Sequence, residues 1–102
     1  MMIAVILTSY GIEFKCEASI KVNGRKIYPD FIVKRPRDGK VFIWEHFGMV
    51  TDDRYQKKAY RRLEEYHNCG IDLWEQLLIS FDQVDGGISA DDIDKMIRMF
   101  LL

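Results

Sequence analysis

Apolar and polar positions along the first half of the chain change their spacing several times, and each spacing predicts an element. Residues 1–10 are mostly apolar and are followed by Gly11, which predicts a short helix that ends there. Apolar and polar residues alternate over residues 13–22, as in a half-buried strand. Residues 28–33 and 41–48 are rich in β-branched and aromatic residues, which is typical of buried strands.

The second half of the chain begins with a longer helical pattern. Thr51 or Asp52 is a suitable N-cap for a helix that runs to about residue 69, and Gly70 is suitable for ending it. Helical spacing places two sets of residues on neighbouring faces of this helix. The first set contains Tyr55, Lys58, Ala59, Arg62 and Tyr66, and the second contains Gln56, Tyr60, Leu63 and His67.

The chain closes with a strand, a turn and a helix. Residues 76–81 predict the strand and residues 82–87 the turn, and Ser89 caps the last helix with Asp92 in the capping-box position. The predicted order is therefore α-β-β-β-α-β-α, and the fold class is α/β.

Three acidic residues are expected to meet across the strands of the first half. Asn23-Gly24 favours a two-residue type I′ turn, which places Glu17 opposite Asp30. If Ile32 pairs with Ile43, Asp30 also lies opposite Glu45, with Cβ atoms roughly 5 Å apart. Carboxylates this close in an apolar sheet need a positive partner, and a divalent cation is the obvious one. A bulge at the neighbouring proline would shift this register and separate the acids.

Composition limits the class of protein. A chain of 102 residues forms one domain, and no apolar run reaches the roughly 18 residues of a membrane span. Two cysteines without metal-ligand spacing predict a reducing, cytoplasmic location. The net charge of −1 argues against a strong nucleic-acid binder, but residues 34–40 and 54–62 are basic and residues 82–94 are acidic.

Asp30 and Glu45 belong to two short sequence motifs whose order along the chain is that of a known family. Tyr28-Pro29-Asp30-Phe31, followed by Trp44-Glu45-His46-Phe47-Gly48 and then a Tyr- and Lys-rich helix, resembles the PD-(D/E)XK nuclease superfamily. More narrowly, it resembles a bacterial branch in which E-H-F-G stands in place of E-x-K. The resemblance covers nearly the whole chain. It implies a restriction-endonuclease-like core, with a mixed sheet flanked by helices, and metal-dependent hydrolysis of DNA phosphodiester bonds.

The resemblance also implies roles for particular residues. Asp30 and Glu45 would bind Mg²⁺ or Mn²⁺, which suits carboxylate oxygens. Phe47 occupies the place of the motif lysine, so Lys58 or Arg62 is expected to supply the positive charge. The superfamily usually has a further acid on the first helix, upstream of this chain's Ile3-Ala4, for which Glu17 would partly compensate. We therefore expect residues 1–102 to be a single nuclease-like domain from a longer protein, lacking the start of its first helix.

Several readings stay open at the level of sequence. We expect the helix to contact DNA through Arg54, Tyr55, Lys57, Lys58 and Arg61. These positions could equally form a solvated face paired with Glu64 and Glu65. The alternative function is a catalytically inactive nuclease-like module that binds nucleic acid or a protein partner. His46 cannot simply replace the motif lysine, because adjacent strand residues point to opposite faces. It is interpreted as a hydrogen-bonded core or rim residue. No membrane association is expected, and the oligomeric state is not predicted.

Overall fold

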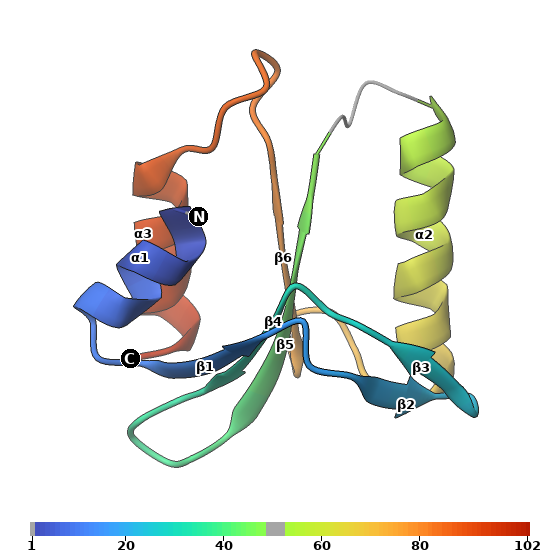
Figure 1. The fold of residues 1–102 in the computed structure, drawn as a ribbon, viewed down its shortest axis with the longest axis horizontal. Helices are drawn as coiled ribbons and strands as arrows, with labels where there is room; N and C mark the ends of the chain where they lie inside the picture. The colour runs from blue at the N-terminus through green and yellow to red at the C-terminus, as the bar shows by residue number, and fades with distance from the viewer. Residues whose placement is uncertain (1, 49–52) are drawn as a thin grey trace.

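A computed structural model describes residues 2–48 and 53–102 of the chain. It is a small α/β protein in which one mixed sheet lies between α1 and α3 on one face and α2 on the other (Figure 1). The elements are α1 (Met2–Ser9), β1 (Glu13–Cys16), β2 (Ile20–Val22), β3 (Arg25–Ile27), β4 (Phe31–Lys34), β5 (Val41–Phe47), α2 (Asp53–Asn68), β6 (Leu77–Phe81) and α3 (Ala90–Phe100).

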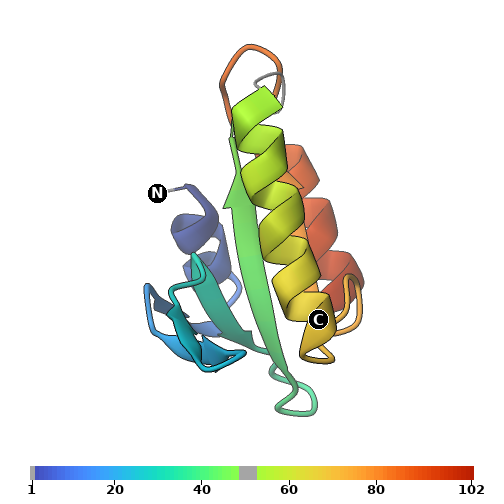
Figure 2. The same cartoon turned by 90° about the vertical axis from the view of Figure 1, so that its right-hand side faces the viewer.

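The four-stranded sheet has the order β1-β4-β5-β6. β4 is antiparallel to both β1 and β5, whereas β5 and β6 are parallel and α2 forms the crossover between them. Ile32 pairs with Ile43, which is the register under which the sequence places Asp30 opposite Glu45. Figure 2 shows α2 running beside the long β5 strand.

The predicted helices and turn are confirmed wherever the structure describes them. Gly11 follows α1 with φ 69°, a left-handed conformation that favours glycine at a helix end. Ser89 caps α3, and its side chain accepts a hydrogen bond from the Asp92 N–H. Asn23 and Gly24 have φ values of 52° and 75°, as a type I′ turn requires, and Val22 pairs with Arg25. The proposed α2 caps, Thr51 and Asp52, lie outside the described residues.

The expectation of a continuous strand over residues 13–22 is wrong. The segment divides into β1 and β2 at Glu17, whose φ of 56° is incompatible with a strand. β3 and β4 divide at the matching point, so the β2–β3 hairpin leaves the main sheet. There Val22 and Ile27 belong to one buried cluster with Tyr66 of α2. Burying this second apolar surface compensates for the lost ladder hydrogen bonds.

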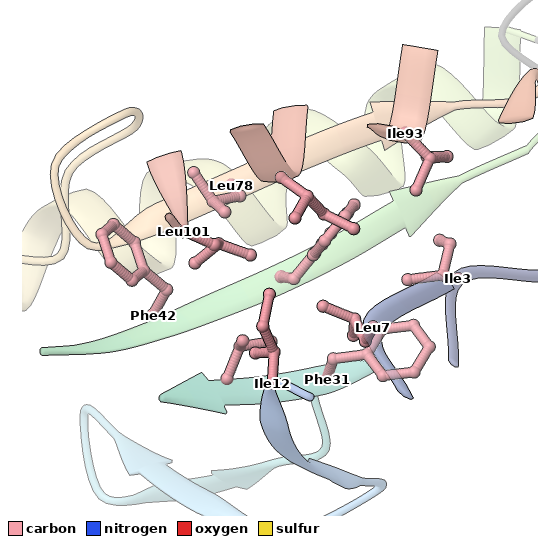
Figure 3. Packing of buried hydrophobic residues seen from close by; sticks show 11 residues of the cluster. Ile3, Leu7, Ile12, Phe31, Phe42, Leu78, Ile93 and Leu101 are labelled. Carbon is pink, nitrogen blue, oxygen red and sulfur yellow. The ribbon is translucent and has the colours of Figure 1, made fainter. Parts of the chain in front are cut away.

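Two cores hold the layers together. The larger one packs α1 and α3 against one sheet face and includes Leu7, Phe42 and Leu101 (Figure 3). The smaller one lies under α2 and includes Ile43 and Tyr66. Strand alternation explains the division, since successive side chains of β5 point to opposite faces. Within residues 2–48 and 53–102, no helix is long and apolar enough to cross a membrane.

Candidate functional site

Asp30 and Glu45 face each other across β4 and β5, as the sequence predicted. Asp30 directly precedes β4, and continuing the Phe31–Trp44 pair by one residue places it opposite Glu45. Two hydrogen bonds fix this arrangement: the Asp30 N–H donates to Glu45 Oε1 at 3.1 Å, and the His46 N–H donates to Asp30 Oδ2 at 2.7 Å. Each carboxylate is therefore held by the backbone of the other strand.

The positive partner of Glu45 is an arginine from α2. Arg62 Nη1 donates to Glu45 Oε2 at 2.8 Å, while Glu45 is only 4% exposed. Burial raises the pKa of Glu45, and the negative charge of Asp30 adds to this effect. The Arg62 guanidinium opposes the rise because it favours the ionised carboxylate. One of the two cations predicted from the sequence thus reaches the carboxylates directly.

Asp30 and Glu45 line a cleft of about 360 Å³, which α2 also borders. Lys58, Arg61 and Arg62 line it from α2, and Arg25 lines it from the β2–β3 hairpin. The face of α2 that carries Tyr55, Lys58 and Arg62 therefore lies over the two carboxylates. The cleft combines a negative floor with a mainly positive rim.

A separate groove of about 510 Å³ lies along the outer surface of α2. The five residues proposed for DNA contact all line it: Arg54, Tyr55, Lys57, Lys58 and Arg61. Glu65, which could have neutralised this face, instead pairs with Arg25 at 3.1 Å. The structure thus gathers the proposed contact residues on one surface beside the carboxylate cleft.

Tyr66 was not predicted to have a role at the site, although helical spacing places it on the same face of the helix as Lys58 and Arg62. Its side chain is fully buried beside the Arg62 guanidinium, and among the described residues its hydroxyl makes no hydrogen bond of good geometry. Burial and the charge of Glu45 both raise the pKa of Tyr66, so the phenol stays neutral beside the ion pair. No sequence signal distinguishes such a residue from an ordinary core tyrosine.

The predicted alignment of three acids is wrong. Glu17 is exposed, lies at the break between β1 and β2, and pairs with no residue of the ladder. Within the part of the chain that the structure describes, no three His, Cys, Asp or Glu residues come together as a group able to hold a metal ion. The carboxylates that face each other at the site are those of Asp30 and Glu45, and Glu65, which also lines the cleft, pairs with Arg25.

His46 belongs to the opposite face of the sheet, as expected from strand alternation. Its Nδ1 lies 2.7 Å from Ser80 Oγ, and its Nε2 lies 2.7 Å from Asp82 Oδ1. Trp44 Nε1 also donates to Ser80 Oγ at 2.9 Å. This chain of hydrogen bonds joins β5 to β6 and to the turn that follows, so the His46 ring supports the strand that carries Glu45.

No model of a known protein family matches this chain, and comparison with curated proteins finds no match. The functional assignment therefore depends on the fold and on the chemistry of the cleft.

Proposed function

We propose that this chain is a restriction-endonuclease-like domain that hydrolyses DNA phosphodiester bonds with the help of Mg²⁺ or Mn²⁺. The main support is that Asp30 and Glu45 face one another in a cleft lined by Lys58, Arg61 and Arg62. A polyanion that bears a scissile phosphate needs this combination, because cationic side chains attract the backbone while carboxylates hold the catalytic cation. The mixed sheet with helices on both faces agrees with the superfamily resemblance.

The donor set is suited to the cation. Mg²⁺ keeps several water ligands and is commonly bound by one or two carboxylates together with substrate phosphate oxygens. Asp30 and Glu45 supply two carboxylates from adjacent strands, in fixed orientations. When bound, the cation would neutralise charge on the scissile phosphate and lower the pKa of a bound water.

The side chains of α2 perform the remaining tasks. Lys58 is the better candidate for holding the attacking water, because its ammonium is a compact donor that can lose its proton. Arg62 stabilises phosphate charge only, since a guanidinium does not deprotonate. Phe47, in the place of the motif lysine, is 7% exposed and packs against Phe81, so it contributes no charge.

A second function is favoured by one specific contact. Arg62 already occupies Glu45 Oε2 at 2.8 Å, so the positive charge that a metal would supply comes in part from the protein itself. A chain with this internal ion pair can bind DNA phosphates without cleaving them. The alternative is therefore a catalytically inactive module that binds nucleic acid through α2.

Cleavage of supercoiled DNA in the presence of Mn²⁺ tests the first function. Wild-type protein should nick the DNA, and Glu45→Gln should reduce the rate by at least about a hundredfold, because it removes a charged metal ligand. Lys58→Met should cause a comparable loss if Lys58 holds the attacking water. Rates of nicking measured by gel electrophoresis give these values directly.

Lys95→Met is the matched control, because Lys95 is an exposed lysine of α3 on the opposite face of the sheet. Its nicking rate should equal that of the wild type. Absence of nicking by the wild-type chain, combined with DNA binding that weakens as salt rises, would favour the inactive module instead. Absence of both activities would refute both functions.

A further inference from the structure

An aromatic hollow of about 390 Å³ lies next to the carboxylate cleft. Phe47, Tyr55, Tyr60 and Phe81 contribute to its walls, and none of the described residues that line it is charged. The rings of Phe47 and Phe81 pack with their centroids 5.8 Å apart. Tyr60 is 69% exposed and Phe81 is 46% exposed, so both present aromatic surface to the solvent.

The hollow is continuous with the site of the proposed chemistry. Phe47, Tyr55 and Ala59 line both the hollow and the carboxylate cleft. On α2, Lys58 and Arg62 point to the cleft, while Tyr60 and Leu63 line the hollow on the neighbouring face. One helix therefore divides a positively charged surface from an aromatic one.

This juxtaposition matches the two parts of a nucleotide. Phosphates are attracted by a cationic groove, whereas every nucleobase has a flat apolar face that stacks on aromatic side chains. In a duplex the bases are paired and stacked inside the helix, so a base can enter a protein hollow only when its nucleotide is unpaired or extruded. Among the described lining residues Gln56 is the one amide and the others are aromatic or aliphatic, which suits stacking better than base-specific recognition.

We propose that the aromatic hollow binds the base of an unpaired nucleotide in single-stranded DNA, while the backbone of that strand follows the cationic face of α2. The inference rests on the proposed function, because the adjoining cleft must first accept phosphate. It adds that single-stranded DNA, or an unpaired end, is the preferred nucleic acid. It also assigns Tyr60 as a base-stacking residue.

Binding without cleavage tests this inference separately from nuclease activity. Fluorescence anisotropy in EDTA compares a labelled oligothymidylate with an abasic oligomer of equal length and charge. Wild-type protein should bind the oligothymidylate about tenfold more tightly, because only this oligomer can stack. Tyr60→Ala should remove most of that preference and leave abasic binding unchanged, whereas Tyr60→Phe should keep it. Alanine is a good helix former and Tyr60 is exposed, so the variant should fold.

Trp74→Ala is the control for loss of an exposed aromatic side chain. Trp74 stacks on Phe100 and lines neither the hollow nor the cleft, and its removal should leave both affinities unchanged. Equal binding of the two oligomers by wild-type protein would overturn the base site while leaving the phosphate surface intact. Binding of neither oligomer would overturn the DNA-binding function as well. A Tyr60→Ala variant that changes self-association but not oligothymidylate affinity would identify the hollow as a protein contact, which also overturns the inference.

Discussion

At the scale of single residues, the site depends on how a buried carboxylate is neutralised. Glu45 is almost fully buried in an apolar strand, and a charge there is costly unless it is paired and hydrogen-bonded. The Asp30 N–H and Arg62 provide these interactions. The pairing of Asp30 with Glu45 was predictable on the condition that Ile32 pairs with Ile43, as it does. The choice of Arg62 over Lys58 as the direct partner was not predictable, because both lie on the same helix face and the tertiary placement of α2 was unknown.

Replacing Arg62 should destabilise the protein in a pH-dependent way. Glu45 has a pKa above its ordinary value of 4.5, so its stabilising contribution is present below that value and is lost as the pH rises through the folded-state pKa. Arg62 limits this rise. Arg62→Met should therefore cost about 1–2 kcal/mol of unfolding free energy near neutral pH and clearly less at about pH 4. Urea unfolding at both pH values measures the difference.

Arg61→Met is the matched control, since Arg61 is the exposed neighbour on the same helix and has no bond to Glu45 among the contacts of the described residues. Its effect on the unfolding free energy should be small at both pH values. If Arg62→Met had the same cost at both pH values, its role in setting the charge of Glu45 would be wrong.

Gly48 has a structural reason to be glycine. A Cβ atom added there would lie 2.6 Å from Asp82 Oδ2, and His46 holds the Asp82 carboxylate in place. The Asp82 N–H also donates to Phe47 O at 2.9 Å, which brings the two chain segments close together. The glycine that follows Glu45-His46-Phe47 therefore allows this close approach and needs no catalytic role.

Gly48→Ala should lower the unfolding free energy by about 1–2 kcal/mol, because the anchored Asp82 carboxylate must move. Gly87→Ala is a suitable comparison: its Cβ would lie 3.3 Å from Asp85 Oδ1, in an exposed turn, and a smaller loss is expected. Chemical denaturation of the two variants measures both values. A larger loss in Gly87→Ala than in Gly48→Ala would contradict this explanation.

At the scale of elements, local sequence signals predicted most of the structure. The Asn23-Gly24 turn, the β4–β5 register and the Ser89 cap all follow from residues close in sequence. The break at Glu17 could not be predicted in this way. Glutamate has no special preference for positive φ, and the hairpin turns away because Val22 and Ile27 find apolar partners in α2, far away in the sequence. Tertiary packing here overrides the local strand pattern.

The surroundings of the two faces of α2 were likewise only partly predictable from the sequence. Helical spacing separates Lys58 and Arg62 from Tyr60 and Leu63, so an amphipathic division was predictable. What each face meets was not fully predictable. The cleft follows from the strand register, whereas the aromatic hollow also requires Phe81 at the end of β6, which reaches Phe47 through a parallel pairing.

At the scale of the whole molecule, the two sides of the sheet differ. The larger core packs against one side, where α1 and α3 lie (Figure 1). The other side carries the carboxylate cleft, the aromatic hollow and the basic face of α2. A net charge of −1 is therefore a poor guide to binding, because four basic residues gather on one helix surface: Arg54, Lys57, Lys58 and Arg61. Local fields of this kind attract a polyanion even when the total charge is near zero.

Binding of a divalent cation should stabilise the whole molecule. A ligand that binds only the folded state raises the unfolding free energy by mass action, by about 2.7 kcal/mol at a hundred times its Kd. Thermal unfolding with Mn²⁺ should therefore have a higher midpoint than without it. Asp30→Asn should abolish this gain, and it should raise the midpoint of the metal-free protein because it relieves repulsion with Glu45.

Two controls separate specific binding from general salt effects. Sodium chloride at equal ionic strength should not reproduce the rise, since screening acts on all exposed charges. Glu64→Gln removes an exposed carboxylate of α2 and should keep the full gain with Mn²⁺. A wild-type midpoint that does not change with Mn²⁺ would show that Asp30 and Glu45 are satisfied by Arg62 and the backbone alone. The cleft would then be a binding surface for phosphate rather than a catalytic centre.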